Sequence, residues 1–227
     1  MLKIRKNKIF NYILVITVAF IILLTDVDAA TITVHYNGNS RVDTYNYTNT
    51  YMQSVHNVVG FNNVGNASVF TQLQNSVIFI AHNHGSPGLQ MLGDSTGIVG
   101  TNGNESTFKS ISSLSVGIGK PLYLAIYYGC STGVATSLYG DIVSYTTSRI
   151  AKSAIAWTDT TYTNHVNTWN KYFFDKGRTT SSTGATALTY ADTSLATELG
   201  SSAVAIMKNK RVTSGSFTWT FASMLYA

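Results

Sequence analysis

The sequence has little that could cross-link it and little charge. Of its 227 residues, one is cysteine, two are proline and 11% are charged. A single cysteine excludes an internal disulfide, so all thiol chemistry must rest on Cys130. The formal net charge is +5, but the basic residues form no stripe, so nucleic-acid binding is not expected. No internal repeat or heptad pattern occurs, which excludes repeat and coiled-coil architectures.

The start of the chain is typical of a targeting segment. Basic residues at positions 3–8 precede an apolar stretch at 13–24, and small residues follow. The apolar stretch is short for a membrane span, which needs about 20 residues. We therefore predict that residues 1–29 are a signal peptide cleaved after Ala29 or Ala30, the alternative being an uncleaved anchor. The protein is then expected to be secreted or associated with the cell surface, with no membrane contact after cleavage.

The rest of the chain, residues 30–227, is predicted to form one α/β domain. Strands are predicted at 31–36, 77–81, 122–126, 154–157 and 203–207, with an edge strand at 217–221. Helices are predicted at 51–59, 67–74, 138–145, 162–173 and 188–199. Residues 85–120 are predicted to form a functional loop with one small strand at 88–93. Strands that alternate with helices imply a three-layer α/β/α sandwich with a mostly parallel central sheet.

Two strand endings carry reactive side chains. His84 follows the predicted strand 77–81, and Cys130 follows the predicted strand 122–126. Because parallel strands place functional groups at their carboxyl ends, we expect a thiol nucleophile beside a proton-transfer partner. A helix beginning just past Gly133 would place the sulfur near a helix N-terminus, which favours a thiolate. The alternatives are a buried, inert cysteine and a histidine satisfied by backbone hydrogen bonds.

The other histidines support weaker hypotheses about a metal site and about a different catalytic pair. His82 and His84 are two positions apart and could bind a metal, but His35, His56 and His165 form no cluster of ligands with them. No metal and no cofactor is therefore expected, and His82 is expected in the core or as an orienting residue. His165 follows Cys130 in the chain, so a thiol hydrolase that uses this pair is a competing hypothesis, although His165 falls within a predicted helix.

Residues 76–192 resemble the caspase-like (clan CD) cysteine peptidases, the group that contains caspases, legumains, clostripain and gingipains. The resemblance rests on His84-Gly85 at the end of one strand and on Gly129-Cys130-Ser131-Thr132-Gly133 at the end of the next. Their order matches, and in caspases the histidine also precedes the cysteine by about 50 residues. The helix with Trp169-Asn170 and Phe173-Phe174 is similar to bacterial members of the clostripain and gingipain type.

The resemblance implies a secreted cysteine endopeptidase that acts on a peptide or protein substrate. Cys130 would attack the scissile carbonyl, and His84 would protonate the leaving amine and then activate water. The backbone N–H groups of Gly85 and Cys130 would hold the oxyanion. Trp157 and Asp159 are candidate substrate-binding residues, the alternatives being a core side chain and a helix N-terminal acid. A caspase-like binding module without activity is the alternative function.

Overall fold

Among the residues that the structure describes, six strands form the central sheet, in the order β10-β9-β8-β3-β1-β2. The computed structural model describes residues 30–225, except 116–121 and 180. Neighbouring strands of the central sheet pair in parallel, except that β10 is antiparallel to β9. The strands are β1 (Thr31–Tyr36), β2 (Asn57–Asn62), β3 (Ser76–His82), β8 (Leu122–Tyr127), β9 (Ala151–Trp157) and β10 (Arg211–Gly215). The prediction of a mostly parallel central sheet is confirmed.

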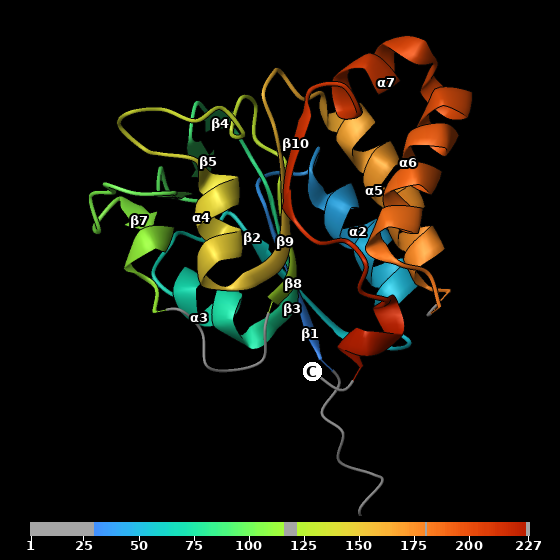
Figure 1. Ribbon diagram of the computed structural model, residues 1–227, viewed down its shortest axis with the longest axis horizontal. Coiled ribbons are helices and arrows are strands. Elements are labelled where there is room, and N and C mark those ends of the chain that lie inside the picture. Colours follow the sequence, from blue (N-terminus) through green and yellow to red (C-terminus); the bar gives the residue numbers. More distant parts are fainter. Residues whose placement is uncertain (1–29, 116–121, 180, 226–227) are drawn as a thin grey trace, which may run out of the picture. The chain divides into compact units, whose positions relative to one another are not determined.

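Helices cover both faces of this sheet (Figure 1). One face carries α2 (Val42–Met52), α5 (Thr163–Gly177), α6 (Gly184–Leu199) and α7 (Ser201–Met207), and the other carries α3 (Val69–Asn75) and α4 (Ile142–Arg149). This is the three-layer sandwich expected from the sequence. None of the helices in the described ranges is both long and apolar enough to cross a membrane. The predicted signal peptide, residues 1–29, lies outside those ranges.

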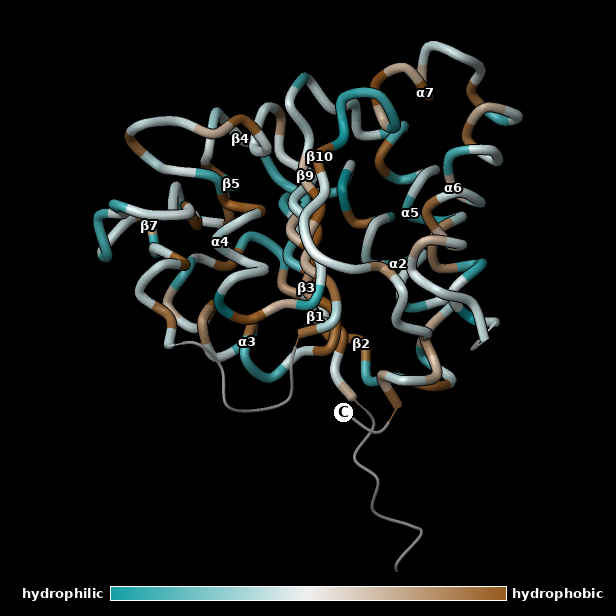
Figure 2. The backbone as a smooth tube through the Cα atoms, viewed as in Figure 1, coloured by the Kyte–Doolittle hydropathy of each residue, from teal (hydrophilic) through white to brown (hydrophobic). Residues whose placement is uncertain are grey.

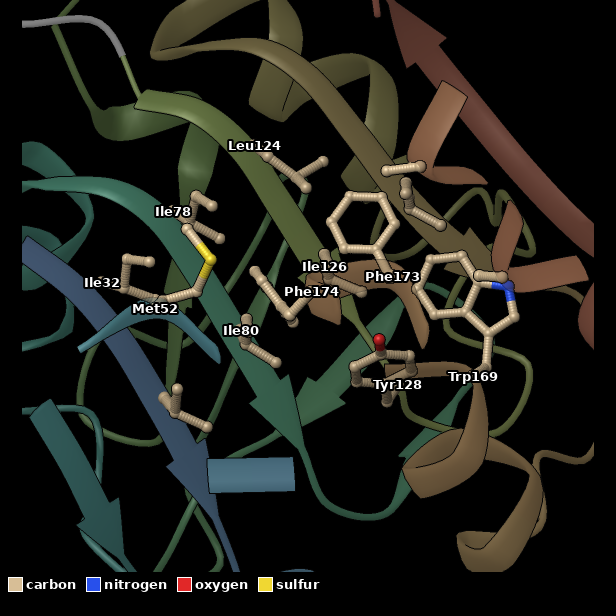
Figure 3. Close-up of a cluster of buried hydrophobic side chains, with 14 of the residues drawn as sticks. Ile32, Met52, Ile78, Ile80, Leu124, Ile126, Tyr128, Trp169, Phe173 and Phe174 are labelled. Atoms are coloured by element: carbon tan, nitrogen blue, oxygen red, sulfur yellow. The ribbon is translucent and has the colours of Figure 1, made fainter. Parts of the chain in front are cut away.

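The two central strands, β3 and β8, are buried along their whole length. Because strand side chains alternate between the two faces, Ile78 and Ile80 join a core beneath α2 and α5, whereas Phe79 packs beneath α3 and α4. Figure 3 shows the first of these cores, with aromatic rings of α5 lying over Ile80 and Ile126. Figure 2 shows hydrophobic residues gathered along the central strands. The middle of the sheet is therefore a rigid base for the residues that follow its strands.

A second, smaller sheet lies between β3 and β8 in the chain. Its four strands, in order, are β4 (Gly85–Ser86), β5 (Leu89–Met91), β6 (Gly97–Val99) and β7 (Phe108–Ser110), followed by the 3₁₀ helix η1 (Ile111–Ser113). The predicted loop at 85–120 is therefore more ordered than expected. Strands of two or three residues are too short to show an alternating pattern, so only the one at β5 was anticipated.

The helix predicted over residues 51–59 is wrong. Helix α2 ends at Met52, and Val58 and Val59 belong to β2, which pairs with β1 at the edge of the sheet. The buried face of α2 is formed instead by Thr44, Thr48 and Met52, which are spaced by four residues. Because two of these three residues are polar, the sequence of α2 shows no apolar stripe. The β-branched valines of β2 happen to recur at helical spacing, which is why a helix was predicted there.

The strands predicted at 203–207 and 217–221 are also wrong. The first is helix α7, in which Ala203 and Met207 face the core four residues apart. The second is an irregular segment whose Phe217 and Trp219 carbonyls accept hydrogen bonds from the first residues of α6. Strand β10 takes the edge position that the sequence assigned elsewhere. Short apolar runs fit a buried helix as well as a strand, so their pattern does not decide between them.

A buried ion pair joins α6 to β10. The Arg211 guanidinium donates to both carboxylate oxygens of Asp192, at 2.8 and 3.0 Å, and the Trp169 indole N–H donates to the same carboxylate at 2.9 Å. The side chains of Arg211 and Asp192 are only 11% and 8% exposed. The pair therefore holds the antiparallel edge strand against the helical layer.

Replacing Asp192 with alanine should strongly destabilise the protein. The Arg211 charge would remain buried without its partner, which typically costs about 3–5 kcal/mol. Urea unfolding of Asp192→Ala against the parent chain measures this loss. The control is Asp175→Ala, because the Arg178 partner of Asp175 is 62% exposed and such surface pairs contribute about 0–1 kcal/mol. Equal losses in both variants would contradict a stabilising role for the buried pair.

Candidate active site

The endings of β3 and β8 lie side by side at one edge of the central sheet. The two strands pair in parallel up to Ala81 and Tyr127, and the Tyr128 N–H donates to the Ala81 carbonyl at 2.8 Å. His84 and Cys130 follow these last paired residues on their respective strands. The parallel pairing therefore delivers both segments to the same edge, as expected from the sequence.

Two glycines allow the segments to touch. A Cβ atom placed on Gly85 would lie 2.8 Å from the Gly129 carbonyl carbon and the Cys130 oxygen, and one placed on Gly129 would lie 2.8 Å from the Gly85 Cα. Both added atoms would also overlap the buried Thr132 hydroxyl. The backbones before Cys130 and after His84 are therefore in van der Waals contact, and glycine is required on both sides.

The Cys130 sulfur is partly exposed and held by Thr161, just after β9. The Thr161 N–H donates to Sγ at 3.4 Å, and the Thr161 carbonyl and hydroxyl oxygens both lie 3.7 Å from Sγ. The Thr161 hydroxyl also donates to the Tyr128 carbonyl at 2.8 Å, which closes the turn around the cysteine. A backbone N–H directed at sulfur stabilises negative charge there.

The expected helix just past Gly133 is absent from this position, since α4 begins at Ile142. The Asp141 carboxylate accepts hydrogen bonds from the Val143 and Ser144 N–H groups and thereby fixes the start of the helix. The helix-dipole argument for Cys130 is therefore wrong.

The turn after Cys130 is instead anchored to the end of β9. Ser131 adopts a left-handed conformation with φ of 57°, which is uncommon outside glycine. Its N–H donates to the Asp159 carbonyl at 3.0 Å, and the Gly133 N–H donates to the Trp157 carbonyl at 2.8 Å. These bonds to β9 and the turn after it hold the sharp bend that presents Cys130.

The two N–H groups expected to hold an oxyanion lie at the contact between the segments. The Met91 N–H donates to the His84 carbonyl, so the next pair, Gly85 and Gln90, is the non-hydrogen-bonded pair of the β4–β5 ladder. The Gly85 N–H therefore points away from β5. Within the described part of the chain, the Cys130 N–H has no hydrogen-bond acceptor.

His84 is exposed and contacts Arg41, a residue that the sequence did not single out. The Arg41 Nη2 lies 3.4 Å from His84 Nε2, and its Nη1 donates to the Asn37 carbonyl at 3.1 Å. Because a guanidinium has donors only, this contact is a hydrogen bond only in an imidazole form that keeps a lone pair on Nε2. The position of Arg41, after the carboxyl end of β1, is the signal that could have identified it.

Arg41 also lies within electrostatic range of the cysteine. Burial lowers the pKa of Arg41, and negative charge at Cys130 raises that pKa. Among the residues that the structure describes, no carboxylate forms an ion pair with Arg41. The positive charge of the guanidinium can therefore interact with the Cys130 thiol and the His84 imidazole without competition from a described carboxylate.

His82 is a core residue. Its Nδ1 donates to the Thr44 hydroxyl at 2.6 Å, because that hydroxyl itself donates to Asn167 Oδ1 at 3.0 Å. Burial, with a smaller contribution from the Arg41 charge, lowers the pKa of His82 to about 3. The ring is therefore neutral, and it fastens β3 to α2. In the described ranges no three histidine, cysteine or acidic side chains gather as metal ligands.

The remaining predicted residues lie around the site. Trp157 has no exposed surface. Its ring stacks on the Tyr128 ring, with 5.0 Å between the ring centroids, and its indole N–H donates to the Met207 carbonyl at 3.0 Å. The Trp157 ring therefore lies in the core and does not line an open pocket. The Asp159 side chain is 53% exposed and lies 3.7 Å from Lys210. The ring of His165 packs edge-on against Tyr162 at 5.2 Å, and none of its described contacts is with the cysteine.

Comparison with known proteins shows the fold. No protein-family model and no curated protein matches the chain. Two crystal structures of the Saccharomyces cerevisiae separase–securin complex match 83% and 82% of this chain, each over 12% of the other chain, with TM-scores of 0.53 and 0.50 and 14% identity. A structure described as that of a protease matches 87% of this chain and 50% of the other, with a TM-score of 0.56 and 11% identity.

The predicted caspase-like fold is confirmed by this likeness to separase, a caspase-like protease. This chain spans half of the matched protease chain and 12% of the matched separase chains. Sequence identities this low show the fold alone. The likeness to clostripain and gingipains in particular stays a prediction from the sequence.

Substituting either contact glycine should push the strand endings apart. Gly85→Ala and Gly129→Ala each force a methyl group against backbone, and such overpacking typically costs about 1–3 kcal/mol. Urea unfolding measures this cost. The matched control is Gly65→Ala, whose added Cβ would meet only side-chain atoms, the nearest at 3.2 Å. Site variants as stable as this control would show that the two backbones are not in contact.

Acid should weaken the fold through His82. The pKa of His82 is about 6.5 in the unfolded chain and about 3 in the folded protein. Between these two pH values the unfolded chain therefore binds a proton at His82 that the folded protein does not bind, and stability falls as the pH falls. Each such proton costs about 1.4 kcal/mol per pH unit. Urea unfolding at pH 7, 6, 5 and 4 should show a shallower loss in His82→Gln, which keeps a donor for Thr44. An unchanged slope would contradict a neutral, buried His82.

Proposed function

We propose that this chain is a secreted cysteine endopeptidase in which Cys130 is the nucleophile and His84 the general acid and base. The observation that carries the proposal is the van der Waals contact between Gly85 and Gly129, which joins the two residues' segments at the end of the central strands. The caspase-like peptidase fold supports the reaction class.

A hydrogen-bond donor and a positive charge lie near the Cys130 sulfur. The Thr161 N–H donates to Sγ at 3.4 Å, and the Arg41 guanidinium adds a positive charge that no described carboxylate neutralises. The thiolate of Cys130 attacks the scissile carbonyl carbon, the C=O electron pair moves to oxygen, and the N–H groups of Gly85 and Cys130 stabilise the resulting oxyanion.

His84 then supplies the proton that the leaving group needs. The His84 imidazole takes the proton of the Cys130 thiol when the thiolate forms, and the resulting imidazolium protonates the amine from Nδ1 as the C–N bond breaks, which leaves the ring neutral. The acyl-enzyme is a thioester on Cys130. Nδ1, now without its proton, takes one from water as that water attacks the thioester, and thiolate leaves. Neither step requires a cofactor.

The substrate in this proposal is a peptide or protein, and Asp159 is its candidate side-chain contact. Asp159 lies in the turn after β9, and its carbonyl holds the Cys130 turn. Its exposed carboxylate would attract a basic side chain, but Lys210 lies beside it, and Arg41 brings the opposite charge to the other side of the site. Substrate libraries should therefore include basic, acidic and neutral residues before the cleaved bond.

Two variants test the proposed pair of residues, and a third is the control. On the chain without residues 1–29, His84→Ala should lower kcat/KM for library peptides by about 10²–10⁴-fold, and Cys130→Ala should abolish cleavage. His165→Ala should stay within about twofold of the parent, because its ring packs on Tyr162. Fluorogenic peptide hydrolysis gives the rates, and mass spectrometry maps iodoacetamide labelling.

The alternatives have distinct outcomes. Activity lost in His165→Ala but kept in His84→Ala would replace this proposal with a thiol hydrolase that uses Cys130 and His165. Slow labelling of Cys130 and no cleavage in any variant would indicate a binding module that keeps the fold without the chemistry.

A further inference from the structure

The side chain of Gln90 is completely buried between the two strand endings. Gln90 lies on β5, its Oε1 accepts a hydrogen bond from the Gly129 N–H at 2.8 Å, and its Nε2 donates to the Met91 carbonyl at 2.9 Å. Nε2 also lies 3.5 Å from the His84 carbonyl. Burying a primary amide is costly unless it is hydrogen-bonded, so an apolar side chain of this size would be the simpler filler. What the amide adds is a link between the segment after His84 and the segment before Cys130.

The first consequence concerns the peptide group between His84 and Gly85. Its carbonyl oxygen accepts from the Met91 N–H at 3.0 Å and faces Gln90 Nε2. In a trans peptide the C=O and N–H point in opposite directions. Holding the carbonyl on the β5 side therefore turns the Gly85 N–H to the other side, away from β5.

The second consequence concerns the turn before the nucleophile. Gln90 Oε1 fixes the Gly129 N–H, and therefore the plane of the peptide group that enters the turn. The Thr132 hydroxyl, after the turn, donates to the Leu89 carbonyl at 3.3 Å, so β5 holds the turn on both sides of Cys130. The Cys130 N–H between these ties has no acceptor in the described part of the chain.

We propose that Gln90 is the positioning residue of the oxyanion hole, one side chain that lies against the His84–Gly85 peptide group, which presents the Gly85 N–H, and that holds the Tyr128–Gly129 peptide group, which adjoins the one presenting the Cys130 N–H. The inference rests on the proposed function and extends it. Gln90 touches neither the sulfur nor the imidazole in its hydrogen bonds, so it acts through these amides. Its loss should weaken binding of the oxyanion and leave the thiol and the bound ground state largely unchanged.

Gln90→Met, similar in length but without the amide, is the test variant. We expect its kcat to fall by about 10²-fold or more with little change in KM, because loss of one oxyanion donor costs about 10²–10³ in rate. The inhibition constant of a peptide aldehyde, whose thiol adduct places an oxygen in the hole, should rise in parallel. Alkylation of Cys130 by iodoacetamide forms no oxyanion and should stay within about threefold.

Two further variants make the test specific. Gln90→Glu keeps an acceptor for the Gly129 N–H and should recover part of the kcat and of the aldehyde affinity. The control is Gln72→Met on α3, which removes another hydrogen-bonded glutamine, the partner of His35 Nε2 at 2.6 Å, and should leave all three measurements unchanged. If Gln90→Met does not fold, as judged by circular dichroism, Gln90→Glu carries the same comparison with smaller changes.

The outcomes separate this inference from the proposed function. Unchanged aldehyde affinity in the Gln90 variants, or alkylation that falls as far as aldehyde affinity does, would overturn the positioning role. A parent protein that cleaves no peptide but forms the aldehyde adduct would end the peptidase proposal, while the adduct would still report on Gln90. A parent that is alkylated rapidly but binds no aldehyde would overturn the inference, because no oxyanion hole would exist.

Discussion

The parallel pairing of β3 with β8 is the interaction on which the candidate site depends. Ala81 lies opposite Tyr127, and one further bond, from the Tyr128 N–H to the Ala81 carbonyl, ends the pairing. Beyond it the chains stay together through the contact of Gly85 with Gly129. Because strand side chains alternate, a slip of one residue would turn every buried side chain of one strand to the wrong layer. The two hydrophobic cores therefore fix the register that sets the segment after His84 against the segment before Cys130.

Behind this edge, polar side chains join the helical layer to the sheet. Thr44 of α2 links the ring of His82 to Asn167 of α5, and the buried Tyr128 hydroxyl donates to Asn170 at 3.1 Å. Since buried polar groups are stable only when paired, such a network has few alternative arrangements. Neutral polar residues, abundant in this chain, thus serve inside the protein as well as on its surface. They make α2 and α5 a fixed support for the segments that carry Arg41 and Thr161.

Long apolar runs made most of the fold predictable, and contacts distant in sequence account for what was missed. Strands β3 and β8 were predicted because they are continuously apolar, and their order placed His84 and Cys130 at one edge. Gln90 and Arg41 gave no local signal, because their contacts with Gly129 and His84 span 39 and 43 positions of sequence. The dipole proposed for Cys130 failed for a local reason, since the Asp141 cap starts α4 beyond the turn.

The anchoring of the Cys130 turn has a consequence for the chain before it is complete. Three of its partners, the Trp157 and Asp159 carbonyls and the Thr161 N–H, are made after Cys130, and β8 lies between β3 and β9 in the sheet. Such non-local pairings form late in folding because a long loop must close first. A nascent polypeptide ending before β9 would contain His84 and Cys130 but would lack these three anchors of the Cys130 turn. The turn that presents Cys130 therefore takes its final shape only after β9 has joined the sheet, so an unfinished chain holds the cysteine in no fixed geometry.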